Sequence, residues 1–216
     1  MPSPLLEPRL GLNGHAERTS SDHDAPTPPT PLANAGPLGL SAFALTTFLL
    51  SMVNAGLVAK GVEPVVFGMA LMMGGIAQML AGLWEFRTGN TFAGTAFIAY
   101  GAFWLSFWAL VQFYLADIPK ADVGDAVGLY LMTWAGFTAY MFVASFKTSR
   151  AVNVVFGLLL LTFLALGIGE LAASTGLTKL GGYLGLATAA AGAYAAMAEV
   201  TNATFGRTVL PIHPLS

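Results

Sequence analysis

The chain has 216 residues, of which 56% are hydrophobic and only 9% charged, whereas ordinary soluble domains carry about 25% charged residues. Its formal net charge of -2 supplies no basic excess for neutralising phosphates, so we expect no nucleic-acid partner. There is no cysteine, and the three histidines, His15, His23 and His213, lie near the chain ends. We therefore expect no metal site, no cofactor and no enzymatic activity.

Residues 1–33 are predicted to form a disordered, proline-rich tail. They hold seven of the twelve prolines and few large apolar residues. Such a composition cannot offset the entropy cost of folding. The tail also lacks the basic start and apolar stretch of a secretory signal, so we do not expect one.

Six apolar segments follow, each long enough to cross a bilayer as a helix. At about 1.5 Å per residue, about 20 residues span the roughly 30 Å hydrocarbon layer. Nearly all charged residues outside the tail lie between the segments or at their ends, which avoids placing charge in lipid. The sequence predicts an all-α, polytopic membrane domain over residues 34–205 and a C-terminal tail over 206–216, with membrane segments at 37–59, 65–84, 91–116, 126–146, 151–173 and 180–200.

The loop charges predict an orientation in the plasma (cell inner) membrane with both termini in the cytoplasm. Lys and Arg are enriched in cytoplasmic loops. An even number of helices then returns the chain to its starting side. This orientation gives a small basic excess inside, with Arg87, Lys147, Arg150 and Arg207 there against Lys60, Lys120 and Lys179 outside.

A short internal recurrence suggests a duplicated half. Val65-Val66-Phe67-Gly68 returns as Val154-Val155-Phe156-Gly157, and the same 89-residue shift superposes Gly39-Leu40 on Gly128-Leu129. Two interpretations are open: two inverted three-helix repeats, of the kind that place a solute path between them, or chance among many Val, Gly and Leu residues.

The first segment carries a face that mixes polar and bulky apolar side chains. Phe43, Thr47, Leu50 and Asn54 recur at helical spacing, with Thr46 beside them. Such a face can line a narrow path, although Ser and Thr in membrane helices often bond their own backbone instead. Further neutral polar groups at membrane depth are Gln78, Thr95, Tyr100, Tyr130 and Thr133.

No charged residue is expected near the middle of the membrane. A path lined only by uncharged side chains suits small anions, because it carries no fixed carboxylate that would repel them. Glu85, Glu170 and Glu199 lie toward segment ends, where we expect them at the interface or paired with basic residues rather than in the path. A coupling role for Glu199 is the alternative.

Two further patterns predict packing. Gly181, Gly185, Ala189 and Ala193 recur at every fourth position of the last segment, which allows a neighbouring helix to approach closely. Trp104 and Trp108 share a face of the third segment, and lipid or a subunit interface is the expected surrounding.

The motif Asn34-Ala35-Gly36-Pro37-Leu38-Gly39-Leu40 resembles the N-P-A-P-L-G-L signature of the acetate uptake transporter family, with Ala35 and Gly36 replacing Pro-Ala. That family includes bacterial succinate-acetate transporters and fungal acetate and ammonia-export-associated proteins. Asn34 and Pro37 remain to cap and start a helix. Other matching blocks occur in order, among them 74–78, 89–92, 100–104 and 205–212.

The resemblance implies a six-helix protomer that assembles as a homo-hexamer, each protomer enclosing a path for acetate and, in bacterial members, succinate. It also implies an apolar constriction at Phe43, Tyr100 and Leu159, with Gly192 opposite. We therefore predict a carboxylate transporter or anion channel, in which Thr46, Thr47, Asn54 and Gln78 assist the solute. Proton symport and channel-like permeation are both open, and the alternative substrate is ammonia or another small neutral solute.

Overall fold

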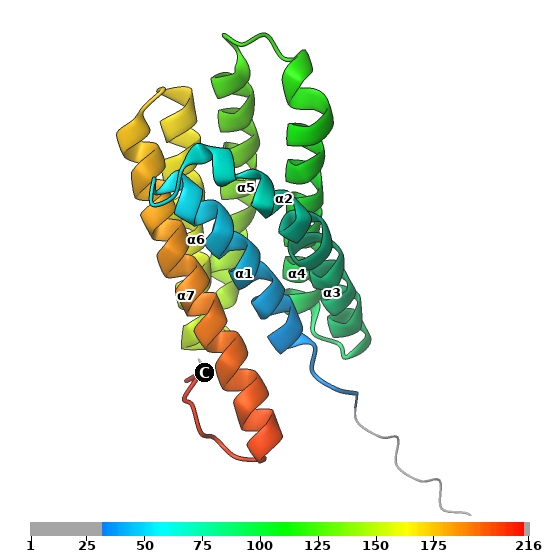
Figure 1. The fold of residues 1–216 in the computed structure, drawn as a ribbon. Coiled ribbons are helices and arrows are strands. Elements are labelled where there is room, and N and C mark those ends of the chain that lie inside the picture. The colour runs from blue at the N-terminus through cyan, green and yellow to red at the C-terminus, as the bar shows by residue number, and fades with distance from the viewer. Residues whose placement is uncertain (1–31, 214–216) are drawn as a thin grey trace, which may run out of the picture. The chain divides into compact units, whose positions relative to one another are not determined.

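The computed structural model describes residues 32–213 of the chain, and residues 33–213 form one helical unit. The predicted tail therefore lies almost wholly outside the described residues. Six antiparallel helical rods make up the unit (Figure 1), and no strand occurs within residues 32–213. The predicted all-α class is confirmed.

Four of the rods are single α-helices, of which the last is the longest, and the other two change helix type along their length. The second rod passes from α-helix to π-helix and back, and the third ends in a π-helix followed by a 3-10 turn. In chain order the elements are α1 Gly36–Asn54; η1 Lys60–Val62; α2 Pro64–Met69, η2 Ala70–Ala77 and α3 Gln78–Arg87; α4 Thr91–Ala109, η3 Leu110–Tyr114 and η4 Leu115–Asp117; α5 Val123–Ser145; α6 Arg150–Leu171; and α7 Thr175–Phe205.

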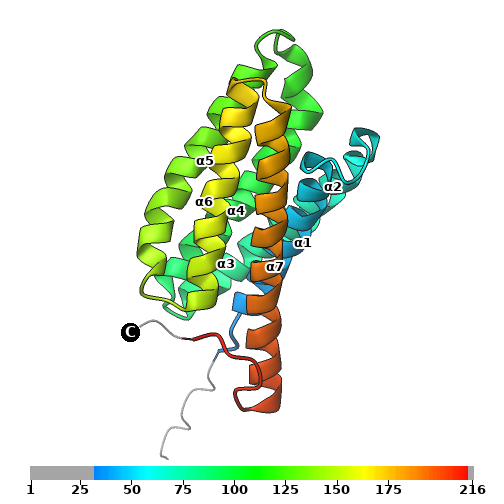
Figure 2. The same ribbon diagram turned by 90° about the vertical axis from the view of Figure 1, so that its left-hand side faces the viewer.

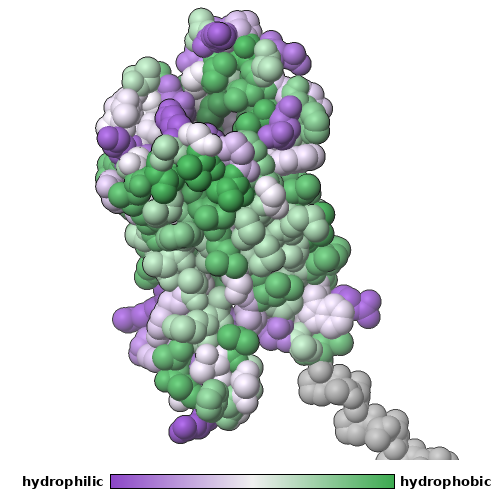
Figure 3. All heavy atoms as spheres, in the orientation of Figure 1, coloured by the Kyte–Doolittle hydropathy of each residue, from purple (hydrophilic) through white to green (hydrophobic). Residues whose placement is uncertain are grey.

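Five of these rods are long and apolar enough to cross a membrane by length and composition. The sixth, α7, is 31 residues long but rich in Ala, Gly and Thr, which lowers its hydropathy rather than its reach. Figure 3 shows the corresponding surface, with apolar residues over the middle of the visible face and most polar residues toward its two ends.

The signature residues form the turn that leads into α1. The Asn34 side chain accepts a hydrogen bond from the Gly36 N–H at 2.8 Å and donates one to Glu199 at 3.2 Å. Glu85 accepts a bond from the Ala35 N–H at 3.0 Å. Two carboxylates from α3 and α7 thus fix the start of α1, and the expected capping role of Asn34 is met one residue earlier than the formal cap, Ala35.

The remaining signature residues begin α1 itself. Pro37 lies in its first turn, where a missing N–H costs nothing. Gly39 faces the ring of Phe97 on α4 so closely that a side chain there would collide with it. Leu40 is buried, whereas Leu38 is 46% exposed.

The helix α7 packs along both α1 and α6, as the two ribbon views agree (Figures 1 and 2). Small residues permit this approach. A Cβ on Gly182 would meet the backbone of Asn54 and Ala55, and one on Gly185 would meet Ser51. The predicted packing stripe is confirmed at Gly181, Gly185 and Ala189, which are buried, whereas Ala193 is exposed.

The two halves of the chain do not pack alike. Under the proposed repeat, the close backbone approach of α1 and α7 should correspond to one between α5 and α4, yet the backbones of α4 and α5 come close at few points and large side chains fill the space between them. The inverted repeat stays a prediction.

Candidate functional site

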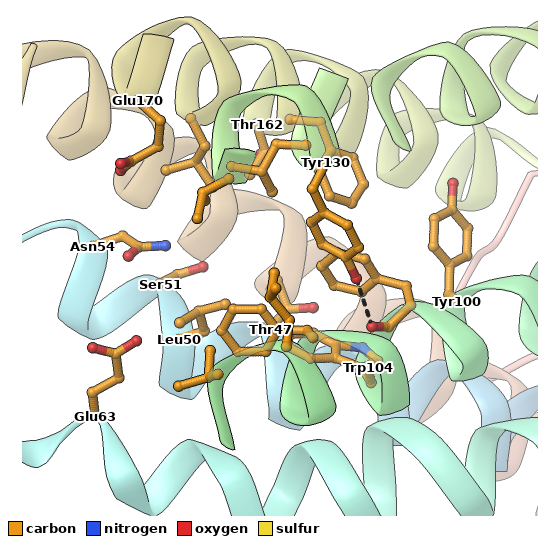
Figure 4. A pocket seen from close by; sticks show the side chains of 18 of the residues that line it. Thr47, Leu50, Ser51, Asn54, Glu63, Tyr100, Trp104, Tyr130, Thr162 and Glu170 are labelled. Carbon is orange, nitrogen blue, oxygen red and sulfur yellow. Dashed lines mark hydrogen bonds between the residues drawn. The ribbon is translucent and has the colours of Figure 1, made fainter. Parts of the chain in front are cut away.

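A cavity of about 320 Å³ opens toward the end of the unit where α1 finishes. The polar face of α1 lines the cavity through Thr47, Ser51 and Asn54, and Phe43 lies at its inner end. Figure 4 shows these side chains together with those of the facing helices. The other helices contribute mainly aromatic and aliphatic groups, including Tyr100, Phe103, Trp104, Phe107, Tyr130, Leu159, Phe163 and Leu166.

A second cavity of about 230 Å³ lies toward the opposite end, beside the start of α1. Its polar residues come from the signature turn, the end of α3, the loop before α4, the turn before α6 and the last part of α7. Apolar groups from the same helices complete the wall. The lining includes Asn34, Leu40, Glu85, Asn90, Phe92, Phe97, Ser149, Val152, Phe156, Glu199 and Ile212.

The order of lining residues along the helices shows that the two cavities follow one another end to end. On α4, Phe92 to Phe97 line the smaller cavity and Tyr100 to Phe107 the larger. On α6 the change falls between Phe156 and Leu159. On α1 it falls between Leu40 and Phe43.

An aromatic and aliphatic constriction separates the cavities. The rings of Phe43 and Tyr100 have centroids 6.0 Å apart, as do those of Tyr100 and Phe156. Leu159 lies one helical turn beyond Phe156, and all four side chains are buried. Phe43, Tyr100 and Leu159, predicted as a set, thus lie together at the inner end of the larger cavity, and Phe156 is an additional member. The spacing of Phe156 and Leu159 by three residues could have indicated it.

Hydrogen bonds fix the orientation of two tyrosines. The Tyr100 hydroxyl lies 3.0 Å from Oγ1 of Thr138, whose own hydroxyl donates to the Trp134 carbonyl. The Tyr130 hydroxyl donates to the Phe103 carbonyl at 2.9 Å, the bond drawn in Figure 4. Because these groups already have partners, they hold the wall rather than offer free donors.

Two buried donors on the wall of the larger cavity lack any hydrogen-bond partner. They are the hydroxyl of Thr47, a residue 6% exposed, and the indole N–H of Trp104, 3% exposed. The expectation that Trp104 faces lipid or another subunit is wrong, because the side chain is buried among α1, η2 and α4, with its ring against Gly74. An unpartnered buried donor costs about 1–3 kcal/mol.

Three predicted site residues lie behind the wall rather than on it. Thr46 is fully buried and bonds the Ala42 carbonyl one turn back. Gln78 is 1% exposed, and its carbonyl oxygen has no partner. Gly192 supports Phe43 from the side of α7, with that ring 3.3 Å from where a Cβ would stand. The structure thus brings Phe43, Thr47, Asn54, Tyr100 and Leu159 together on one cavity and leaves Thr46, Gln78 and Gly192 in the surrounding shell.

Four glutamates line the cavities. Glu63 and Glu170 line the larger cavity near its open end, and Glu85 and Glu199 line the smaller one. Sequence position placed Glu85, Glu170 and Glu199 at segment ends but gave no sign of which way they face, and Glu63 was not singled out. The constriction itself stays uncharged.

Among residues 32–213, no group of three His, Cys, Asp or Glu side chains is arranged to hold a metal ion. The groups that line the two cavities are hydroxyls, amides, aromatic rings, aliphatic side chains, carboxylates and the Lys60 ammonium.

A model of the GPR1/FUN34/yaaH family matches residues 17–216. The chain belongs to that family. It is 42% identical over 183 residues to the succinate-acetate/proton symporter SatP of Escherichia coli K12, covering 85% of this chain and 96% of that protein. It is also 42% identical over 197 residues to ammonia transport outward protein 2 of Saccharomyces cerevisiae, covering 89% of this chain and 69% of that one.

A solved structure of the bacterial acetate channel SatP has the same fold. The two structures superpose with a TM-score of 0.79 at 41% sequence identity, covering 84% of this chain and 99% of the SatP chain. With its membrane-length apolar helices, the chain is a polytopic membrane protein.

Proposed function

We propose that this protein moves small carboxylates, acetate foremost and succinate as a second candidate, along the two cavities and through the constriction between them. One observation carries the proposal: two cavities lie end to end along a membrane-length bundle, with the buried side chains of Phe43, Tyr100, Phe156 and Leu159 between them. The relatives named for acetate supply the substrate class.

A small carboxylic acid titrates near the Glu reference of about 4.3, so at neutral pH it is almost entirely anionic and crosses lipid poorly. In the larger cavity, the Thr47 hydroxyl and the Trp104 N–H can replace part of the water around its carboxylate. The constriction then admits a solute only when that solute is small enough and has lost most of its water.

Permeation is proposed to be channel-like. The residues of the constriction include no carboxylate, lysine or histidine that could carry a proton across it. The relative named a proton symporter supports the rival mechanism, for which Glu199 on the smaller cavity is the candidate carrier.

Proteoliposomes containing the purified protein test both points. We expect uptake of labelled acetate to respond to an imposed membrane voltage, and Glu199→Gln to retain that uptake. Electroneutral uptake that Glu199→Gln abolishes would establish coupling and contradict the channel-like mechanism. Vesicles without protein give the background leak.

Ammonia is the second candidate substrate, because an uncharged constriction also passes neutral solutes and one relative is named for ammonia transport. The same vesicles loaded with a pH indicator compare an ammonium gradient with an acetate gradient. Ammonia permeation without acetate uptake would mean that ammonia, and not acetate, is the substrate.

We further propose a homo-hexamer in the plasma (cell inner) membrane with both termini in the cytoplasm. Large side chains such as Leu129 (68% exposed) and Val143 (67% exposed) on α5 offer apolar surface for lipid or neighbouring copies. The mass of the protein in detergent, corrected for bound detergent, tests the stoichiometry.

A further inference from the structure

Charged side chains surround the open end of the larger cavity. Lys60, Glu63 and Glu170 all line it, so the formal charge of this lining is -1. Figure 4 shows Glu63 and Glu170 on opposite sides of the cavity, with Asn54 and Ser51 projecting between them. The two glutamates are far apart in sequence, since Glu63 directly precedes α2 and Glu170 lies in the last turn of α6.

Deeper in the same cavity the chemistry favours an anion. The Thr47 hydroxyl and the Trp104 N–H are buried donors with no partner, and the lining residues at that depth carry no charge. A carboxylate that enters through the open end of the larger cavity passes Glu63 and Glu170 before it reaches these donors.

The two features together distinguish solutes by charge. Coulomb repulsion scales with the product of the charges, so a dianion is repelled twice as strongly as a monoanion at the same place. When one end of a dicarboxylate meets the donors, the other end must point back toward the glutamates. The opposite direction is closed by Phe43, Tyr100 and Leu159.

We propose that Glu63 and Glu170 make the larger cavity select monocarboxylates over dicarboxylates. This inference rests on the proposed carboxylate transport and adds a specificity that no relative's name assigns. The repulsion slows entry of both classes but weighs more on the dicarboxylate, and Lys60 partly offsets it.

The experiment measures labelled succinate and labelled acetate uptake into proteoliposomes at pH 7, at low ionic strength and equal driving force. We expect the succinate-to-acetate ratio to rise about threefold or more in Glu63→Gln and in Glu170→Gln, and further in the double variant. Lys60→Gln should lower the ratio. Asp125→Asn is the matched control, because Asp125 is exposed near the same end but does not line the cavity.

Salt supplies a readout that needs no variant to fold. Raising the ionic strength shortens the screening length from about 30 Å at 0.01 M to about 3 Å at 1 M, so the wild-type ratio should rise with salt, and the double variant should respond less. An unchanged ratio in the double variant, with acetate uptake intact, overturns the charge selection alone. Absence of acetate uptake in the wild type overturns the proposed function and the selection with it.

Discussion

Leu159 is the aliphatic member of the constriction and is buried there, so under the proposed function its size should limit the solutes that pass. Leu159→Ala removes three carbons from a buried position, so we expect uptake of bulkier monocarboxylates to rise severalfold relative to acetate. The lost packing should also lower the free energy of unfolding by about 2–4 kcal/mol. Competition of unlabelled acids against labelled acetate measures the change in selectivity.

The matched control is Leu161→Ala on the same helix, because Leu161 is 51% exposed and does not line the cavity. Its selectivity should equal that of the wild type. Unaltered selectivity in Leu159→Ala would place this side chain away from the conduit.

Trp104 supplies a donor that a phenylalanine cannot. We expect Trp104→Phe to raise the apparent KM for acetate about tenfold or more, since a hydrogen bond to a charged group contributes about 1.5–3 kcal/mol. Initial rates of labelled acetate uptake over a concentration series measure it. Trp108→Phe makes the same substitution one turn along, on a residue outside the cavity lining, and should leave KM unchanged. Equal KM values for both variants would argue against a role for the indole N–H.

At the scale of elements, the contact between α1 and α7 depends on glycines. A Cβ on Gly182 would collide with the backbone of α1 at Asn54 and Ala55, which cannot move aside as a side chain could. We expect Gly182→Ala to lower the free energy of unfolding by about 1–3 kcal/mol, measured by thermal unfolding in detergent.

Gly68→Ala tests whether that loss is specific to the contact. Gly68 lies in α2 with nothing within 4 Å of its added Cβ, so alanine should be neutral or stabilise by about 0.4–1 kcal/mol. Since alanine is the better helix former, equal destabilisation by both substitutions would mean that the loss in Gly182→Ala does not come from its contact with α1.

The helices themselves could be predicted closely from the sequence, because lipid imposes both a length and an absence of charge. The segment 126–146 became α5, Val123–Ser145, and 151–173 became α6, Arg150–Leu171. The π-helical stretch Ala70–Ala77 could not be predicted. Within it, Gly74 and Gly75 lie against Trp104 and Leu105 of another helix, a contact that no local pattern contains.

At the scale of the whole molecule, helix order puts Asn34 and Glu199 at one end and Asn54, Glu63 and Glu170 at the other. The absence of cysteine allows a clean test of which end faces outward. We expect a membrane-impermeant maleimide to label Ala121→Cys in intact cells and Thr88→Cys only after permeabilisation. Both positions are exposed, at opposite ends of the third rod. The reverse pattern would invert the proposed orientation.

The site was harder to predict than the helices, for a physical reason. In water an apolar face points inward, but in lipid apolar residues satisfy both directions, so helical spacing groups residues without saying which group faces the interior. The grouping of Phe43, Thr47 and Asn54 was therefore right, whereas Trp104 was assigned the wrong surrounding. Likewise, Glu170 was visible at a segment end, but Glu63 was not singled out, and their convergence required the fold.

The barrier between the cavities is made of individual side chains on three helices, not of a loop or a helix end. Turning a few rings and one isobutyl group is a smaller event than rocking one half of a bundle against the other, which takes microseconds to milliseconds. We therefore expect the rate of permeation to be limited by dehydration of the solute, and the backbone to keep nearly the same conformation throughout.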